Sequence, residues 1–310
     1  MNDPLQLFFD NLEKINLYFG TDANKFGKDL AIKLTVRNVP FYYEDYEKVQ
    51  QQIKIHTKWY HLVRNNYRIS HAYYVHLSKQ PEKISDVVHM YKVLTQKFNR
   101  GEQSYLTALY LHSKEDIERL TSLVNEMRSK PSIKFGFPSS LIGCAILANR
   151  PEDPVTLLES FECYYNKLLS IGFKRSNETK YTALLLTVGT GTFCDDTFAH
   201  LKNIADFVRR AEAHIRVCHY KTIGLLALAK FEVQQFPALF DMHEEICRQL
   251  KLKPSDCNSL LLTAQIYTSN EAIGNLYANN IDFSDFAHMV LDNSFDTGGS
   301  HDGDASSGGD

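Results

Sequence analysis

The chain has 310 residues and a formal net charge of −3, with 34 Lys and Arg against 37 Asp and Glu. This near-neutral balance gives no broad positive field for anionic membranes or for extended contact with nucleic acid. Asp3 follows Met1 too closely for a secretory signal. Apolar runs such as residues 224–229 are far shorter than the ~18 residues of a membrane span. We therefore expect a cytoplasmic protein without membrane segments.

The N-terminal segment predicts one amphipathic helix, which we expect to cap the structure. Its apolar residues recur at intervals of 3 or 4 residues, as one face of a helix requires. They are Phe8, Leu12, Ile15 and Phe19. Residues 30–53 end in a second stripe of this kind. It consists of Tyr42, Tyr46, Val49 and Ile53, and we interpret it as a degraded first copy of a recurring unit.

A two-helix unit recurs along the rest of the chain. Each copy begins with a short, nearly all-apolar segment centred on a small residue, followed by a polar turn and an amphipathic segment. The small residues are Ala72, Ala108, Ala145, Ala183, Gly224 and Ala264. Their spacings of 36, 37, 38, 41 and 40 residues indicate stacked helical pairs, which cover each other's apolar segments. The sequence predicts an all-α fold of about seven antiparallel helix pairs, as an open α/α superhelix or a toroid-like ring.

Helix-end signals agree with these boundaries. Ser113 and Asp116 have the spacing of a capping box, and Asp153 precedes Pro154 as an N-cap precedes a proline in the first helical turn. Gly172 lies where a left-handed glycine commonly ends a helix. No stretch alternates apolar and polar residues, so we expect no sheet.

The composition changes near the C-terminus. Residues 292–310 contain five Asp and no Lys or Arg, and Gly and Ser supply much of the remainder. Such a segment buries too little apolar surface to offset the entropy of ordering. We therefore expect a single α-helical repeat domain over residues 1–294 and a disordered Gly/Ser/Asp tail over residues 295–310.

The six cysteines form no CxxC pair and are too sparse for a disulfide framework in a chain of this size. They are Cys144, Cys163, Cys194, Cys218, Cys247 and Cys257. Most of them lie in apolar helical contexts, where a thiol packs as a small hydrophobic group. The sequence therefore predicts reduced, buried thiols.

Lys48–Pro81 is the strongest candidate for a binding region, because it combines cations, histidines and aromatic residues with no Asp or Glu. Cations and aromatic faces together suit an anionic partner. The residues that we expect to line a binding surface are Trp59, His61, Arg64, Arg68, His71 and Tyr74. The alternative is structural: the aromatic rings pack between helices and the cations form a solvated face.

Nothing in the sequence indicates a metal, a cofactor or catalysis. His71 and His76 are five residues apart, which places them about 140° apart on a helix and unsuitable as paired metal ligands. Acidic pairs such as Glu115 and Asp116 are the residues that a hydrolase needs. They recur in the same turn of successive units, however, at the start of the second helix, where capping and the helix dipole favour acids.

Two stretches are similar to a known family. They are KWYHLVRNNYRISHAYYVHLS at residues 58–78 and YYNKLLSIGFKRSNETKYTALLLTV at residues 164–188. Together with the recurring units they resemble an uncharacterised bacterial family, domain of unknown function four thousand and three, over roughly residues 5–290. The resemblance implies an all-helical, cytoplasmic protein. That family has no established activity and therefore supplies no catalytic residues.

The sequence does not establish a function. We expect a non-catalytic helical-repeat scaffold that binds a protein or peptide on its concave face. One alternative is an α/α-toroid enzyme acting on a small molecule or glycan, which requires a pocket with carboxylates of raised pKa. Another is binding of nucleic acid or an anionic ligand through Lys48–Pro81, although the near-neutral charge disfavours nucleic acid.

Overall fold

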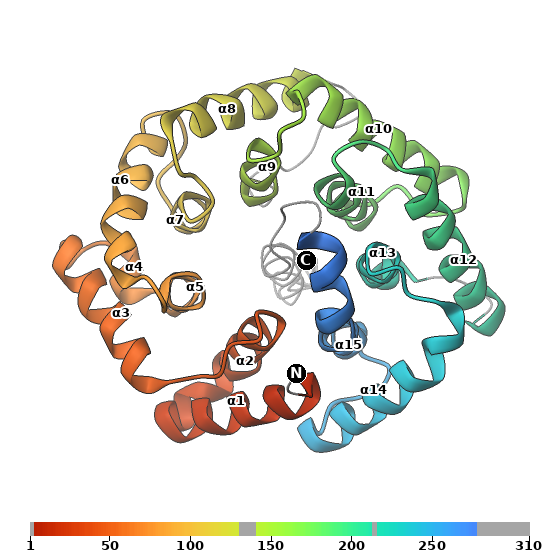
Figure 1. Ribbon diagram of the computed structural model, residues 1–310, viewed down its shortest axis with the longest axis horizontal. Coiled ribbons are helices and arrows are strands. Elements are labelled where there is room, and N and C mark those ends of the chain that lie inside the picture. The colour runs from red at the N-terminus through yellow and green to blue at the C-terminus, as the bar shows by residue number, and fades with distance from the viewer. Residues whose placement is uncertain (1–2, 130–140, 213–215, 278–310) are drawn as a thin grey trace, which may run out of the picture.

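The computed structural model describes residues 3–129, 141–212 and 216–277, and these residues contain helices and no strand. The helices alternate between an outer and an inner layer of a ring (Figure 1). The outer helices are α1 (Pro4–Phe19), α3 (Tyr43–His56), α6 (Ile84–Leu94), α8 (Lys114–Ser129), α10 (Pro154–Ser170), α12 (Asp195–Glu212) and α14 (Phe236–Leu250). The inner helices are α2 (Gly27–Val36), α5 (Tyr67–Leu77), α7 (Glu102–Ala108), α9 (Leu141–Ala148), α11 (Asn177–Thr190), α13 (Tyr220–Leu228) and α15 (Cys257–Tyr277).

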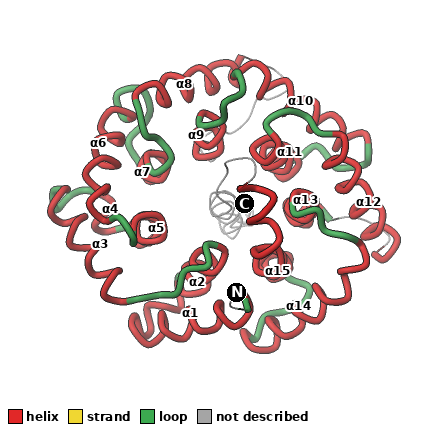
Figure 2. Tube along the Cα trace, in the orientation of Figure 1, coloured by secondary structure: helices red, strands yellow, loops and turns green. Residues whose placement is uncertain are grey.

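Short helices lie in the connections (Figure 2). They are η1 (Gly20–Lys25), α4 (Leu62–Asn65), η2 (Pro81–Lys83), η5 (Val217–His219) and η6 (Val233–Gln235). Each outer helix is followed by an inner helix, so the outer-to-inner connections share one end of the ring and the inner-to-outer connections share the other. The all-α fold that the sequence predicts is confirmed for the described residues.

The ring is closed, because the last inner helix, α15, packs against both α1 and α2. The sequence left an open superhelix and a ring as alternatives, and the structure shows the ring. The N-terminal helix, expected to be a cap, is instead the outer helix of the first pair. Phe8 and Ile15 of its apolar stripe are fully buried. We call the junction between α1–α2 and α14–α15 the seam.

The small residues of the recurring unit lie on inner helices and let these helices approach one another closely. The five alanines of that set are at most 1% exposed. At Gly224, a Cβ atom would lie 2.8 Å from Cγ2 of Thr182 on the neighbouring α11, which is closer than ordinary van der Waals contact. The backbone of α13 at Gly224 therefore packs directly against side chains of α11, and this close packing leaves no room for a larger side chain at that position.

The predicted helix ends form as expected. Ser113 and Asp116 exchange side-chain and backbone bonds of 2.9 and 3.1 Å at the start of α8. The Asp153 carboxylate accepts a bond from the backbone N–H of Val155 at 2.9 Å. Gly172 has a φ of +93°, the left-handed conformation that favours glycine after a helix.

Asn11 joins α1 to the connection between α2 and α3. Its side chain is fully buried. Oδ1 accepts a bond from the backbone N–H of Phe41 at 2.7 Å, and Nδ2 donates to the carbonyl oxygen of Val39 at 3.1 Å. One amide thus satisfies two backbone groups, the buried N–H of Phe41 and the partly buried carbonyl of Val39.

The prediction of reduced thiols is wrong for two cysteines. Cys218 and Cys257 form a disulfide with Cα atoms 5.9 Å apart, and Cys218 is exposed. They are 39 residues apart in sequence, close to the length of one recurring unit, so packing of neighbouring units brings them together. Cys144, Cys163, Cys194 and Cys247 are free, and of these Cys144 and Cys247 are buried.

Two further expectations concern the membrane and the tail. Within the described ranges, no helix combines the length and apolarity needed to cross a bilayer. The predicted tail, residues 295–310, and the predicted domain end at residue 294 both lie outside the described residues.

Candidate functional site

The candidate site lies in the connection from α3 to α5, at the outer-to-inner end of the ring. Arg64 of α4 fixes the C-terminal end of α3. Its Nε donates to Oγ1 of Thr57 at 3.0 Å, and its Nη2 donates to the carbonyl oxygens of Lys54 and Thr57. The guanidinium thus satisfies carbonyl groups that the helix end leaves open, where a cation also complements the helix dipole.

Bonds to α7 hold the same connection from the inner side. Nδ1 of His61 lies 2.7 Å from the hydroxyl oxygen of Tyr105. Asn66 caps α5 by accepting from the backbone N–H of Arg68, and its Nδ2 donates to Glu102 at 2.7 Å. Arg68 forms an ion pair with Glu102 at 3.3 Å. The connection is therefore fixed to α3 of its own pair and to α7 of the next pair.

Large hydrophobic side chains on this connection and at the adjoining helix ends are exposed to solvent. In the described part of the chain eleven such side chains are exposed, and five of them fall between residues 55 and 67. These five are Trp59 (78% exposed), Ile55 (68%), Tyr60 (58%), Leu62 (44%) and Tyr67 (44%). We define these residues together with Lys58 as the rim patch. The Tyr60 ring contacts Trp59 edge-on and stacks on His61, with the Lys58 ammonium 5.9 Å from its centroid.

The residues around the rim patch carry positive charge. Lys58 within the patch and Lys54 beside it are exposed, and the carboxylate of Glu102 is engaged by Arg68 and Asn66. The pKa of His61 lies below its ordinary value, because burial and the charges of Lys92, Arg64 and Lys58 disfavour the imidazolium. The charge near the patch therefore comes from Lys and Arg, and His61 acts as a neutral hydrogen-bonding group.

The six residues expected to form one surface are divided by the structure. Trp59, His61 and Arg64 lie in the α3–α5 connection, and Arg68 lies on the first turn of α5. His71 and Tyr74 are core residues, 3% and 1% exposed, so they do not line a surface in this structure.

The surroundings of His71 and Tyr74 explain their burial. Four rings surround His71, with centroids 4.3 to 5.8 Å from its own; they belong to Phe19, Phe26, Tyr46 and Tyr67. Burial, and secondarily the charge of Lys33, lowers the pKa of His71 to about 3. The Tyr74 hydroxyl donates to the carbonyl oxygen of Tyr42 and accepts from its N–H. Both side chains therefore join α5 to the elements beside it.

A pocket of about 280 Å³ lies at the seam. Its polar lining includes Lys25, Lys28 and Asp29 from the first pair and Asp256 and Asn258 from the last. Charges of both signs meet there, and the pocket opens at the same end of the ring as the rim patch.

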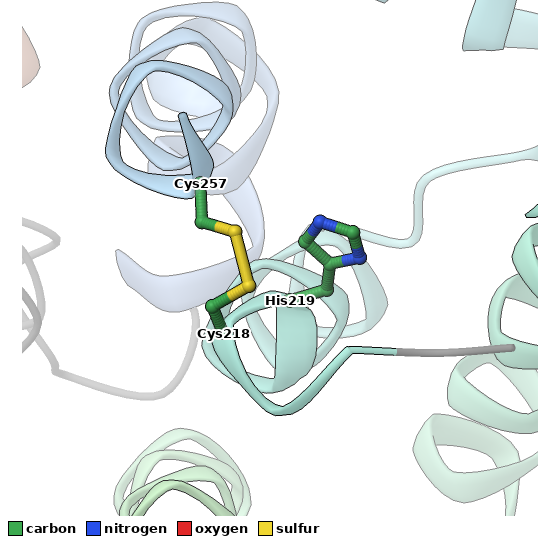
Figure 3. Close-up of side chains that lie close together, drawn as sticks. All are labelled: Cys218, His219 and Cys257. Carbon is green, nitrogen blue, oxygen red and sulfur yellow. A yellow bond between two sulfur atoms is a disulfide. The ribbon is translucent and has the colours of Figure 1, made fainter. Parts of the chain in front are cut away.

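A third group of functional side chains lies where η5 meets the start of α15. Cys218, His219 and Cys257 place two sulfur atoms and an imidazole nitrogen within 4.8 Å of one another, and Figure 3 shows the imidazole beside the sulfur pair. Thiolates and imidazole are the ligands that zinc prefers. Sequence reasoning missed this group, although the 39-residue separation of the cysteines, close to one unit, was a usable signal.

The carboxyl groups give no support to acid–base catalysis. Among the described residues, the three carboxyl groups with a shifted pKa are all shifted downward. Burial raises the pKa of Glu152, but bonds from Arg150 outweigh it. Bonds from Lys202 and Arg248 lower the pKa of Asp206 and Glu245 respectively. A general acid at neutral pH needs the opposite shift.

Comparison with known proteins supports the family expected from the sequence. The family described as "Protein of unknown function (DUF4003)" matches residues 9–284, which is most of the chain. No curated protein and no solved structure matches. The chain therefore belongs to this family of proteins of unknown function.

Proposed function

We propose that the protein is a non-catalytic scaffold that binds an acidic peptide segment of a partner protein at the rim patch. The observation that carries the proposal is the concentration of five exposed large hydrophobic side chains within residues 55–67. Exposed large apolar side chains that gather in one region commonly mark an interaction site, and Trp59 and Tyr60 are in direct contact. We also propose that the helix pairs are copies of one repeated unit, and that the protein works in the bacterial cytoplasm.

The composition of the rim patch supports this role. Trp and Tyr are enriched among the residues that dominate binding energy, because they bury much area with few rotatable bonds. Trp59 and Tyr60 are of this type, and they are held by a connection that Arg64, His61 and Asn66 fix to neighbouring helices. A fixed site loses little conformational entropy on binding.

The charge around the rim patch supports an acidic partner. Lys54 and Lys58 stand beside the aromatic side chains, and no acidic residue occurs between Lys48 and Pro81. Complementary charge speeds association and fixes orientation, and its effect weakens as salt is added. A peptide that combines Asp or Glu with apolar residues satisfies both features of the patch.

Trp59 provides a built-in probe, because it is the sole tryptophan of the chain. Linear peptides rich in Asp and Glu are selected from a display library on the wild-type protein alone, so that the selection does not favour peptides that depend on Trp59. Bound peptides should shift Trp59 emission to shorter wavelength as the indole leaves water. By anisotropy of a labelled peptide, Trp59→Ala should weaken Kd by about 30-fold, the equivalent of a 2 kcal/mol hot spot.

Val155→Ala is the matched control, because Val155 is a similarly exposed apolar residue on α10. It should bind the selected peptides as the wild type does. Equal affinity of wild type, Trp59→Ala and Tyr60→Ala would overturn the proposal. An emission shift given by oligo-dT and by no peptide would assign the patch to nucleic acid. Peptide binding confined to a chain lacking residues 295–310 would assign it to the chain's own acidic segment.

A further inference from the structure

Cys218, His219 and Cys257 lie together because two inner helices begin side by side. Cys218 and His219 end η5, which leads into α13, and Cys257 is the first residue of α15. η5 packs against α15, and the three ligand-type atoms lie within 4.8 Å of one another. The packing of η5 against α15 therefore brings the three side chains to one point (Figure 3).

The chemistry of this group suits a borderline-soft divalent metal. Zinc takes Cys sulfur at about 2.3 Å and His nitrogen at about 2.0–2.1 Å, usually in tetrahedral geometry. Two thiolates and one imidazole supply three of the four positions. Because Cys218 is exposed, water can reach an ion bound there and fill the fourth position.

The surroundings provide an apolar wall on one side and access on the other. His219 is buried and lines a small apolar cavity with Phe207, Phe236 and Leu260. Cys218 on the opposite side is open to solvent, which gives an ion a path to the sulfur atoms. An apolar shell around a metal site limits solvent access and strengthens its electrostatic interactions.

We propose that the reduced protein binds one Zn²⁺ through Cys218, His219 and Cys257. A dithiol reductant supplies two electrons and two protons to the disulfide, giving two Cys thiols and the oxidised reductant. Zn²⁺ then replaces the two thiol protons, which pass to solvent, and the sulfur atoms separate to about 3.8 Å, as tetrahedral geometry requires. The ion then links η5 to α15 in place of the disulfide. This site is independent of the rim patch.

Co²⁺ tests the site directly, because thiolate ligands give intense charge-transfer absorption and tetrahedral geometry gives strong visible bands. Full-length protein, reduced and kept anaerobic, should bind one Co²⁺ with both signatures, and Zn²⁺ should displace it. Zn²⁺ should also protect two thiols from a disulfide reagent. Cys218→Ser and Cys257→Ser should each weaken Zn²⁺ binding by more than the roughly 100-fold that loss of an outer-shell partner costs.

Cys163→Ser is the matched control, since Cys163 is a free, partly exposed cysteine on α10. It should leave both spectrum and affinity unchanged. Cys218 is exposed, so its replacement should leave the fold intact, and circular dichroism checks this. A weak octahedral Co²⁺ spectrum of the wild type, or a thiolate band that keeps its full intensity in Cys218→Ser, overturns the proposal. A disulfide that dithiols fail to reduce in the folded protein overturns it as well.

Discussion

Acidification should destabilise the protein through His71. The fold lowers the pKa of this residue from 6.5 to about 3, first because it is buried and second because Lys33 is near. Between pH 6.5 and about pH 3, His71 therefore binds a proton in the unfolded chain but stays neutral in the folded chain. The contribution of the neutral imidazole to the free energy of unfolding is fully present above pH 6.5. It is lost as the pH falls from 6.5 toward 3, and it changes no further below pH 3.

The magnitude follows from the size of the shift. Each pKa unit corresponds to 1.36 kcal/mol, so acidification from pH 7.5 to 4.5 should remove about 2.7 kcal/mol through His71 alone. This is a large part of the 5–15 kcal/mol that stabilises a typical domain. The pKa of the partly buried His76 is also lowered, chiefly by desolvation, so the whole protein should lose more than this amount.

The test compares the pH dependence of variants instead of their absolute stabilities. Urea unfolding at pH 7.5 and 4.5 gives the loss for the wild type, for His71→Leu and for His89→Gln, an exposed histidine on α6. His71→Leu should lose about 2.7 kcal/mol less than the wild type between the two pH values, and His89→Gln should match the wild type. Equal pH dependence in wild type and His71→Leu would refute the reasoning.

Three further substitutions test the packing. Asn11→Ala leaves the Phe41 N–H and the Val39 carbonyl without their side-chain partner, and it should lower the free energy of unfolding in urea by about 2–5 kcal/mol. Asn24→Ala, at an exposed asparagine, should change this free energy little. Cys257→Ser removes a disulfide that links residues 39 positions apart, and without reductant it should lower the free energy of unfolding by about 4 kcal/mol. An equal loss under reducing conditions would contradict the assignment of this loss to the disulfide. Gly189→Ala places a Cβ atom 2.5 Å from Leu228 and should lower the thermal midpoint, with Leu228→Ala in the same chain restoring part of it.

The helices of the fold were predictable because their signals are local. Apolar spacing and small central residues identified the inner and outer helices, and Ser113, Asp153 and Gly172 marked helix ends that the structure confirms. Ring closure was not predictable. It depends on the fit of α15 to α1 and α2, and no local pattern encodes the curvature that accumulates over successive pairs.

The candidate site was only partly predictable, because composition identifies a region but does not orient its side chains. Trp59 and His71 occur in one acid-free stretch, yet one is 78% exposed and the other 3%. The difference arises from a bend at Thr57–Asn66, which turns Trp59 outward, while His71 enters the inner layer. Glu102, which neutralises Arg68, lies one unit away in sequence and was not a candidate.

A closed ring has no terminal unit, and this alters how the molecule should respond to damage. In an open array, removing an end pair uncovers one interface and the remainder persists. Here, deletion of α1 and α2 would expose two interfaces to solvent: the face of α15 on one side of the gap, and the faces of α3 and α5 on the other. The first and last helices therefore depend on each other, and unfolding should proceed as one event instead of fraying inward from an end.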